Sequence, residues 1–174
     1  KKEIGDAVMP HKDIVELAAP MSEDHKDVRD SILPSLLVCV AYKQARSIKD
    51  IALFEISNVY GLGHVEERLA VAASGALQEN RWQKFRMEVD FYTVKGLVEA
   101  LLESIGYQGS RVVFKENHTD IVHFHPYRSA EVYLGRELLG LVGQIHPKMA
   151  QAYDITETLA LEINLADLLK NQTG

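Results

Sequence analysis

The chain has 174 residues, of which 47% are hydrophobic and 25% are charged. These proportions are those of a folded globular protein, and they exclude a disordered or fibrous one. A chain of this length can bury about two thirds of its unfolded surface without disulfides. The formal net charge of -6 argues against a surface built mainly to neutralise nucleic-acid phosphates. We therefore expect a single globular domain over residues 1–174.

The sequence contains one cysteine, Cys39, so no intrachain disulfide can form. Cys39 lies within an apolar helical pattern, and we expect it to be buried. No apolar run approaches the roughly 20 residues that span a bilayer. The cytoplasm is the expected compartment. The chain begins with Lys1, and we expect it to be part of a larger protein.

The first predicted elements are a strand over residues 13–17 and an exposed turn over residues 19–25. A helix is then expected from Ser31 or a neighbour, acting as the cap, to about Arg46. Pro34 would lie in its first turn, where a missing N–H costs little. The apolar stripe of this helix comprises Leu33, Leu36, Leu37, Val40 and Ala41.

Residues 51–60 are rich in β-forming side chains and apolar on both faces, which predicts a central strand covered on both sides. Residues 68–74 would be its antiparallel partner. A second helix is predicted after Asp90 as its cap, ending at Gly106. Its apolar stripe comprises Val94, Leu97, Val98, Leu101, Leu102 and Ile105.

Four further strands are predicted, and two short helices should begin near Pro147 and Leu165. A hairpin turn at residues 135–137 would join the second and third of these strands. Strands joined mostly by short turns and interrupted by two long helices predict an α+β fold with a mostly antiparallel sheet flanked by helices. The four strands cover residues 112–114, 130–134, 138–144 and 159–163.

Three nearby histidines, His118, His123 and His125, could supply metal ligands, with Asp120 or Glu116 as a carboxylate. Their spacing fits no established zinc pattern. A histidine-dependent metalloenzyme stays open as an alternative. We expect structural or solvent-facing roles for these side chains, and we assign no metal site.

The sequence offers little for nucleophilic or phosphate chemistry. No serine lies in a nucleophile-elbow pattern. The pair Gly61 and Gly63 follows a predicted strand, but it lacks the third glycine and the helix of a dinucleotide site. A turn between antiparallel strands is the better interpretation.

Two basic segments each have a functional and a structural interpretation. The forked donors of Arg128 could hold a carboxylate or phosphate, but we favour a structural ion pair or a backbone-carbonyl contact. The segment from Trp82 to Arg86 mixes aromatic and basic residues, as a nucleic-acid contact would. We favour a loop with two buried rings.

An ordered set of short blocks resembles the β subunit of bacterial phenylalanyl-tRNA synthetase, in its catalytic-like core. The resemblance runs from about Ile14 onward. The blocks are residues 19–22 with Arg29, 31–37, 53–56, Asp90-Phe91 with Lys95-Gly96, His125-Pro126 with Arg128 to Ala130, and Gly143 with His146-Pro147. Ala19 stands where the family usually has Asn, and Tyr127 stands where it often has Gly. Lys95-Gly96, Ser129 to Val132 and His146-Pro147 also resemble the catalytic α subunit.

This resemblance implies a class II aminoacyl-tRNA synthetase-like fold and permits a chemical comparison. Catalytic domains of that class place one arginine in the second motif and one in the third, to hold ATP phosphates. Here Val59-Tyr60 is followed by Gly61, and the nearest arginine, Arg68, falls on the next predicted strand. Residues 159–165 contain neither the glycines nor the arginine of the third motif.

The resemblance therefore implies a structural, subunit-assembly domain in which no catalytic, cofactor-binding or metal-binding residue is expected. The parent enzyme would use ATP and magnesium to attach phenylalanine to tRNA. Its active site would lie in an α subunit, within an (αβ)2 heterotetramer. The α-subunit contact could use the helix over 34–46 or that over 90–105. The alternative is a freestanding sensor of an amino acid or nucleotide, with a pocket lined by Arg128 and the loop from His123 to His125.

Overall fold

The computed structural model describes residues 31–61, 64–80, 82, 85–107 and 111–170. The strand expected at 13–17 and the turn expected at 19–25 lie outside these residues.

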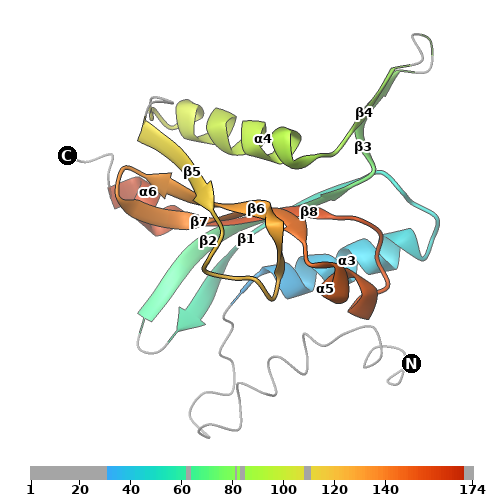
Figure 1. Cartoon of the computed structure of the whole chain (residues 1–174), viewed down its shortest axis with the longest axis horizontal. Coiled ribbons are helices and arrows are strands. Elements are labelled where there is room, and N and C mark those ends of the chain that lie inside the picture. Colours follow the sequence, from blue (N-terminus) through green and yellow to red (C-terminus); the bar gives the residue numbers. More distant parts are fainter. Residues whose placement is uncertain (1–30, 62–63, 81, 83–84, 108–110, 171–174) are drawn as a thin grey trace, which may run out of the picture.

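A six-stranded sheet forms the centre of the described part of the chain (Figure 1). Its strand order is β1-β2-β8-β7-β6-β5, and every neighbouring pair is antiparallel. The strands are β1 (Ile51–Gly61), β2 (His64–Ser74), β5 (Val112–Glu116), β6 (Phe124–Leu134), β7 (Glu137–Ile145) and β8 (Leu159–Asn164). The expected α+β fold with an antiparallel sheet is confirmed. β6 begins at Phe124 rather than Ala130, across a register shift.

Helices cover both faces of this sheet and divide the core in two (Figure 1). On one face lie α3 (Leu33–Gln44) and α5 (Pro147–Ala152). On the other lie α4 (Phe91–Ser104) and α6 (Leu165–Lys170). The first core joins α3 to β1, β2 and β8, and the second joins α4 and α6 to β6, β7 and β8. The helices expected near Pro147 and Leu165 are confirmed.

Helix α3 buries the predicted stripe, with Pro34 in its first turn. The expectation for Cys39 is wrong, because this side chain is exposed. At 3.6 residues per turn, Cys39 lies on the side of α3 that points away from the sheet, whereas the neighbouring Val38 still packs against the core. An apolar residue within a helical run is therefore not necessarily on its buried face.

Helix α4 has the predicted bounds to within two residues, but the prediction is wrong for Leu97, which belongs to the predicted apolar stripe and is exposed. The Asp90 carboxylate accepts a hydrogen bond from the Thr93 backbone N–H at 2.7 Å, completing a capping box. Gly106 follows the last turn with φ +95°, a conformation that favours glycine. Val94, Val98 and Leu102 face the sheet and are buried.

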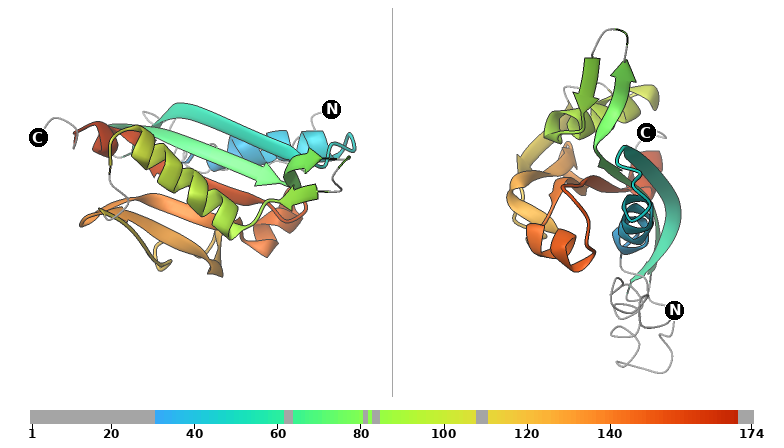
Figure 2. Two further views of the ribbon diagram at one scale, coloured as in Figure 1. Left: turned by 90° about the horizontal axis from the view of Figure 1, so that it is seen from above. Right: turned by 90° about the vertical axis from the view of Figure 1, so that its right-hand side faces the viewer.

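The prediction that β1 is a central strand covered on both sides is wrong. β1 is an outer strand, bordered by β2 alone among the described strands. Its odd-numbered residues face α3, but Phe54, Ile56 and Tyr60 on the other face are 72%, 53% and 44% exposed. Seen from above, α4 leaves β1 uncovered (Figure 2, left). Apolar side chains on both faces predicted the strand correctly but did not show that both faces were covered.

A separate hairpin, β3 (Ala76–Asn80) and β4 (Phe85–Glu88), projects from the sheet (Figure 2, right). Asp50 anchors its base by accepting hydrogen bonds from the Ala76 N–H and the Arg86 guanidinium, both at 2.9 Å. Trp82 is 97% exposed, so the expected loop with two buried rings is wrong for this ring.

Among the described residues, no helix has the length and apolar character needed to cross a membrane.

Candidate functional site

A cleft of about 630 Å³ opens on the α3 side of the sheet. Strands β2, β7 and β8 form its floor. Its rim is formed by the segment before β6 and by Ser31, which precedes the N-cap residue of α3. Its lining comprises Ser31, Glu66, Arg68, Thr119, Asp120, Val122, His123, Phe124, Leu138 to Leu141, Glu162 and Asn164.

Glu162, on β8, ties the floor of the cleft to the start of α3. Its side chain is only 10% exposed. One carboxylate oxygen accepts a hydrogen bond from the Ser31 hydroxyl at 2.7 Å, and the other accepts one from the Ile32 N–H at 2.8 Å. A carboxylate is favourable there because the helix N-terminus carries partial positive charge.

The cap was expected at Ser31 or a neighbour, and the N-cap position is indeed taken by the neighbouring Ile32, but without a cap from its own side chain. The Ser31 hydroxyl accepts a hydrogen bond from the Leu33 N–H at 3.2 Å and donates to Glu162. The capping carboxylate thus comes from a strand 130 residues away in the chain.

Arg68 lies on β2 as expected, and it points toward carboxylates. Its Nη2 is 2.9 Å from Glu66 Oε2, and its Nη1 is 3.9 Å from Glu162 Oε1. Gly61 ends β1 and pairs with His64 at the start of the antiparallel strand β2, whereas residues 62 and 63, including Gly63, lie outside the described residues. The arginine of the cleft therefore contributes its charge to pairs with carboxylates.

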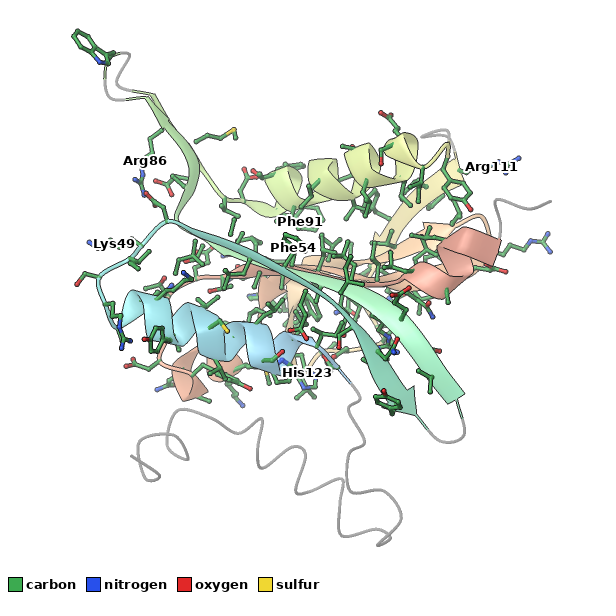
Figure 3. The ribbon with its side chains drawn as sticks, turned by 180° about the vertical axis from the view of Figure 1, so that it is seen from behind. Lys49, Phe54, Arg86, Phe91, Arg111 and His123 are labelled. Atoms are coloured by element: carbon green, nitrogen blue, oxygen red, sulfur yellow. The ribbon has the colours of Figure 1, made fainter. Side chains whose placement is uncertain are left out.

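His123 and Asp120 form an ion pair at the rim, on the same side of the sheet as α3 (Figure 3). His123 Nδ1 lies 2.7 Å from Asp120 Oδ2. This hydrogen bond raises the pKa of His123 above 6.5, although burial opposes the shift. Burial disfavours ionised Asp120, but hydrogen bonds from the His123 ring and backbone, and from the Val122 N–H, hold its pKa below 3.8.

A polar network fixes the segment that carries this pair. Asn117 is 2% exposed and donates hydrogen bonds to the Asp120 carbonyl at 2.7 Å and the Ser129 hydroxyl at 2.9 Å. Glu131 accepts hydrogen bonds from the His118 N–H and the Thr119 hydroxyl. Neither role was predicted from the sequence. Asn117 and Asp120 are common turn formers, which was the available signal.

The three histidines do not converge. His118 lies 3.7 Å from Glu116 and is largely exposed, whereas His125 Nδ1 accepts a hydrogen bond from the Tyr127 N–H at 3.1 Å. Within the described ranges, no group of three or more His, Cys, Asp or Glu side chains could hold a metal ion.

Arg128 lies within β6, is exposed, and does not line the cleft. Its Nη1 donates a hydrogen bond to the Gln144 side-chain oxygen at 3.3 Å. This contact is neither the ion pair nor the backbone contact that we expected.

The charged side chains of the cleft are arranged as pairs that connect neighbouring elements, which suits a structural role better than the binding of a triphosphate. Three carboxylates line it, from Glu66, Asp120 and Glu162, and they contact the side chains of Arg68 and His123. Phosphoryl and adenylyl chemistry depends on unopposed positive charge aimed at phosphate oxygens. In this cleft a carboxylate occupies the end of the α3 helix that would favour an anion.

The fold of the described residues is similar to that of solved aminoacyl-tRNA synthetase structures. Two solved structures of pyrrolysyl-tRNA synthetase from Desulfitobacterium hafniense superpose with TM-scores of 0.60 and 0.58. They are 19% and 18% identical in sequence, and each match covers 84% of this chain and 50% of that one. At such identities the likeness concerns the fold alone.

The particular family follows from the sequence. Residues 1–165 match the family described as phenylalanyl tRNA synthetase beta chain CLM domain, and the chain belongs to it. A phenylalanine--tRNA ligase beta subunit from Geobacillus kaustophilus is 37% identical over 166 residues, which is 91% of this chain and 20% of that protein. One from Staphylococcus aureus (strain MSSA476) is 34% identical over 172 residues, 95% of this chain and 21% of that protein. The chain thus spans about a fifth of these relatives.

Replacing Glu162 by Gln should lower the free energy of unfolding by about 1–3 kcal/mol, because the α3 N-terminus loses a buried charged acceptor. Urea unfolding measures this change. The matched control is Glu157→Gln on the exposed surface, which should change the free energy by less than about 0.5 kcal/mol. Equal effects of the two substitutions would contradict the capping role.

The Asp120–His123 pair should make stability depend on pH. The raised pKa of His123 contributes stability that is fully present below 6.5 and is lost as pH rises through the folded-state value. The lowered pKa of Asp120 contributes stability present above 3.8 and lost as pH falls through its folded-state value. Unfolding free energies from about pH 5.5 to about pH 8.5 should fall less steeply in His123→Gln than in the unmodified chain. Parallel profiles would disprove the coupling.

Proposed function

We propose that the chain is the non-catalytic, class II-like core of a phenylalanyl-tRNA synthetase β subunit, with a structural role in subunit assembly. The observation that carries this proposal is the carboxylate of Glu162, which caps α3 inside the cleft of a retained synthetase-like sheet. The family match supports the β-subunit assignment.

The electrostatics of the cleft support the absence of adenylation chemistry. ATP brings several negative charges, and its transition state requires donors aimed at the transferring phosphoryl group. A nucleotide phosphate next to the α3 N-terminus would meet Glu162, which already accepts the Ser31 hydroxyl and the Ile32 N–H. We assign no catalytic, cofactor-binding or metal-binding residue to this chain.

The proposed parent is an ATP- and magnesium-dependent ligase that attaches phenylalanine to its tRNA in the cytoplasm. In this proposal the α subunit carries the active site, and the two subunits form an (αβ)2 heterotetramer. The names of the relatives as phenylalanine--tRNA ligase beta subunits support the parent reaction. The present chain would supply one folded core within that assembly.

The amino-acid or nucleotide sensor is a weaker candidate. It predicted a pocket lined by Arg128, but Arg128 lies outside the cleft lining and contacts Gln144. Of the residues predicted to line that pocket, His123 does line the cleft, and it is paired with Asp120.

The purified chain should support no phenylalanine-dependent exchange of pyrophosphate into ATP above the background without phenylalanine. The physical reason is that, among the described residues lining the cleft floor, the positive charge of Arg68 lies beside the carboxylates of Glu66 and Glu162. A complete phenylalanine--tRNA ligase in the same assay is the positive control. Exchange that co-elutes with the chain would end the non-catalytic assignment.

The assembly role predicts a specific partner. A tagged copy of the chain, expressed together with an α subunit from the same organism, should retain that subunit through affinity and size-exclusion chromatography. An unrelated class II synthetase expressed in the same way is the control for non-specific binding. Retention of neither protein, with the chain itself folded, would argue against an assembly role for this core.

A further inference from the structure

The outer edge of the sheet at β1 has the features of a pairing surface. β1 runs for 11 residues, and no described strand lies on its outer side. Exposed edges in monomeric proteins are usually protected by Lys, Pro, a bulge or a short strand. β1 contains no Lys, Arg or Pro, and its only charged side chain is Glu55. The β1–β2 register is also continuous from Ile51 to Gly61.

The register shows which backbone groups of β1 are directed outward. Gly61 is paired with His64 across a two-residue connection. In such a hairpin the closing pair exchanges both N–H···O bonds, and bonded pairs alternate with non-bonded pairs along the ladder. The odd-numbered residues of β1 therefore bond to β2. The even-numbered residues, from Ala52 to Tyr60, direct their N–H and C=O groups toward the outer side of β1, where no described strand lies.

An apolar surface lies beside this edge, on the α4 face of the sheet. Phe54 and Ile56 from β1 and Val65 from β2 are each more than half exposed. Leu69 and Val71, opposite Ile56 and Phe54, are half-buried and pack against the α4 core. Figure 3 shows Phe54 on this surface and His123 on the opposite one. The surface thus continues an existing hydrophobic core to the edge of the sheet.

We propose that this edge binds a second copy of the chain, with the two β1 strands antiparallel about a two-fold axis at Ile56. Ile56 then faces its own copy, and Phe54 faces Asn58. The outward N–H and C=O groups of the even-numbered residues bond across the axis, two bonds for each pair. The two sheets become one continuous sheet.

The sequence of β1 suits this self-pairing. Centring the pair on Ile56 places the only charged residue, Glu55, opposite Ser57, so no like charges meet. On the α4 face the pairs are Ala52 with Tyr60 and Phe54 with Asn58, each joining a large side chain to a smaller one. A two-fold contact requires one surface to complement itself, which this register achieves. The proposal goes beyond the proposed function and does not depend on it.

Sedimentation velocity of the full 174-residue chain over a range of concentrations tests the proposal. The chain should show a concentration-dependent monomer–dimer equilibrium. Ile56→Lys should weaken dimerisation at least about tenfold, because two ammonium groups would meet at the axis and the apolar contact would be lost. The matched control is Val113→Lys, which adds the same charge at an exposed valine on β5, the opposite outer strand. The control should dimerise like the unmodified chain.

A charge-swap experiment distinguishes pairing in the two-fold register from non-specific association. Ile56→Lys and Ile56→Glu should each be monomeric, but an equimolar mixture should form a heterodimer, since opposite charges then meet at the axis. Amide hydrogen exchange should show Phe54, Ile56 and Asn58 protected only in the dimer.

Three results would overturn the proposal. They are a chain that stays monomeric at all concentrations, a dimer that Ile56→Lys and Val113→Lys weaken equally, and protection of these amides in the monomer. The last result would mean that another part of the chain occupies the edge. None of these results changes the expected absence of adenylation, which the exchange assay tests separately.

Discussion

The carboxylate of Glu162 is the interaction on which the α3 side of the molecule depends. It accepts hydrogen bonds from the first residues of α3 and lies within reach of Arg68 on β2. One residue on an inner strand therefore connects a helix start, a neighbouring strand and the floor of the cleft. Because it is almost buried, its hydrogen bonds are made in a low effective dielectric and its loss would leave several donors unsatisfied.

Close strand packing places this carboxylate. A side chain at Gly140 on β7 would collide with the backbone carbonyl of Glu162, so glycine allows β7 to approach β8 at this point. Gly143, with φ +149°, allows a similar approach to β6 at Ser129. Both glycines lie in the strand that separates β8 from β6. The position of Glu162 thus depends on the absence of a side chain at Gly140.

The local sequence pattern predicted the helices and strands well, but it predicted less well which of their faces other elements cover. Helix α4 could be predicted to within a residue or two, because its cap, its periodicity and its terminal glycine all lie within one short segment. The exposure of one face of β1 could not be predicted. A two-residue period shows which side chains share a face, but it does not show which face another element covers. Glu162 belongs to the segment 159–165, which the sequence comparison marked as lacking the glycines and the arginine of the third motif. Its role as a cap could not be predicted, since its partners lie 130 and 131 residues away.

The Glu162 carboxylate bears on both the retained fold and the proposed loss of chemistry. Active-site charges that await a substrate tend to cost stability, because they are held near like charges or without partners. A carboxylate at the α3 N-terminus pairs with donors of the chain itself, so it stabilises the free protein. The cleft can then persist as a consequence of the sheet and helix geometry, without selection for a ligand. In the structural role proposed above, such a domain would contribute surface and rigidity to an assembly, and the pairing of its cleft charges would be compatible with that role.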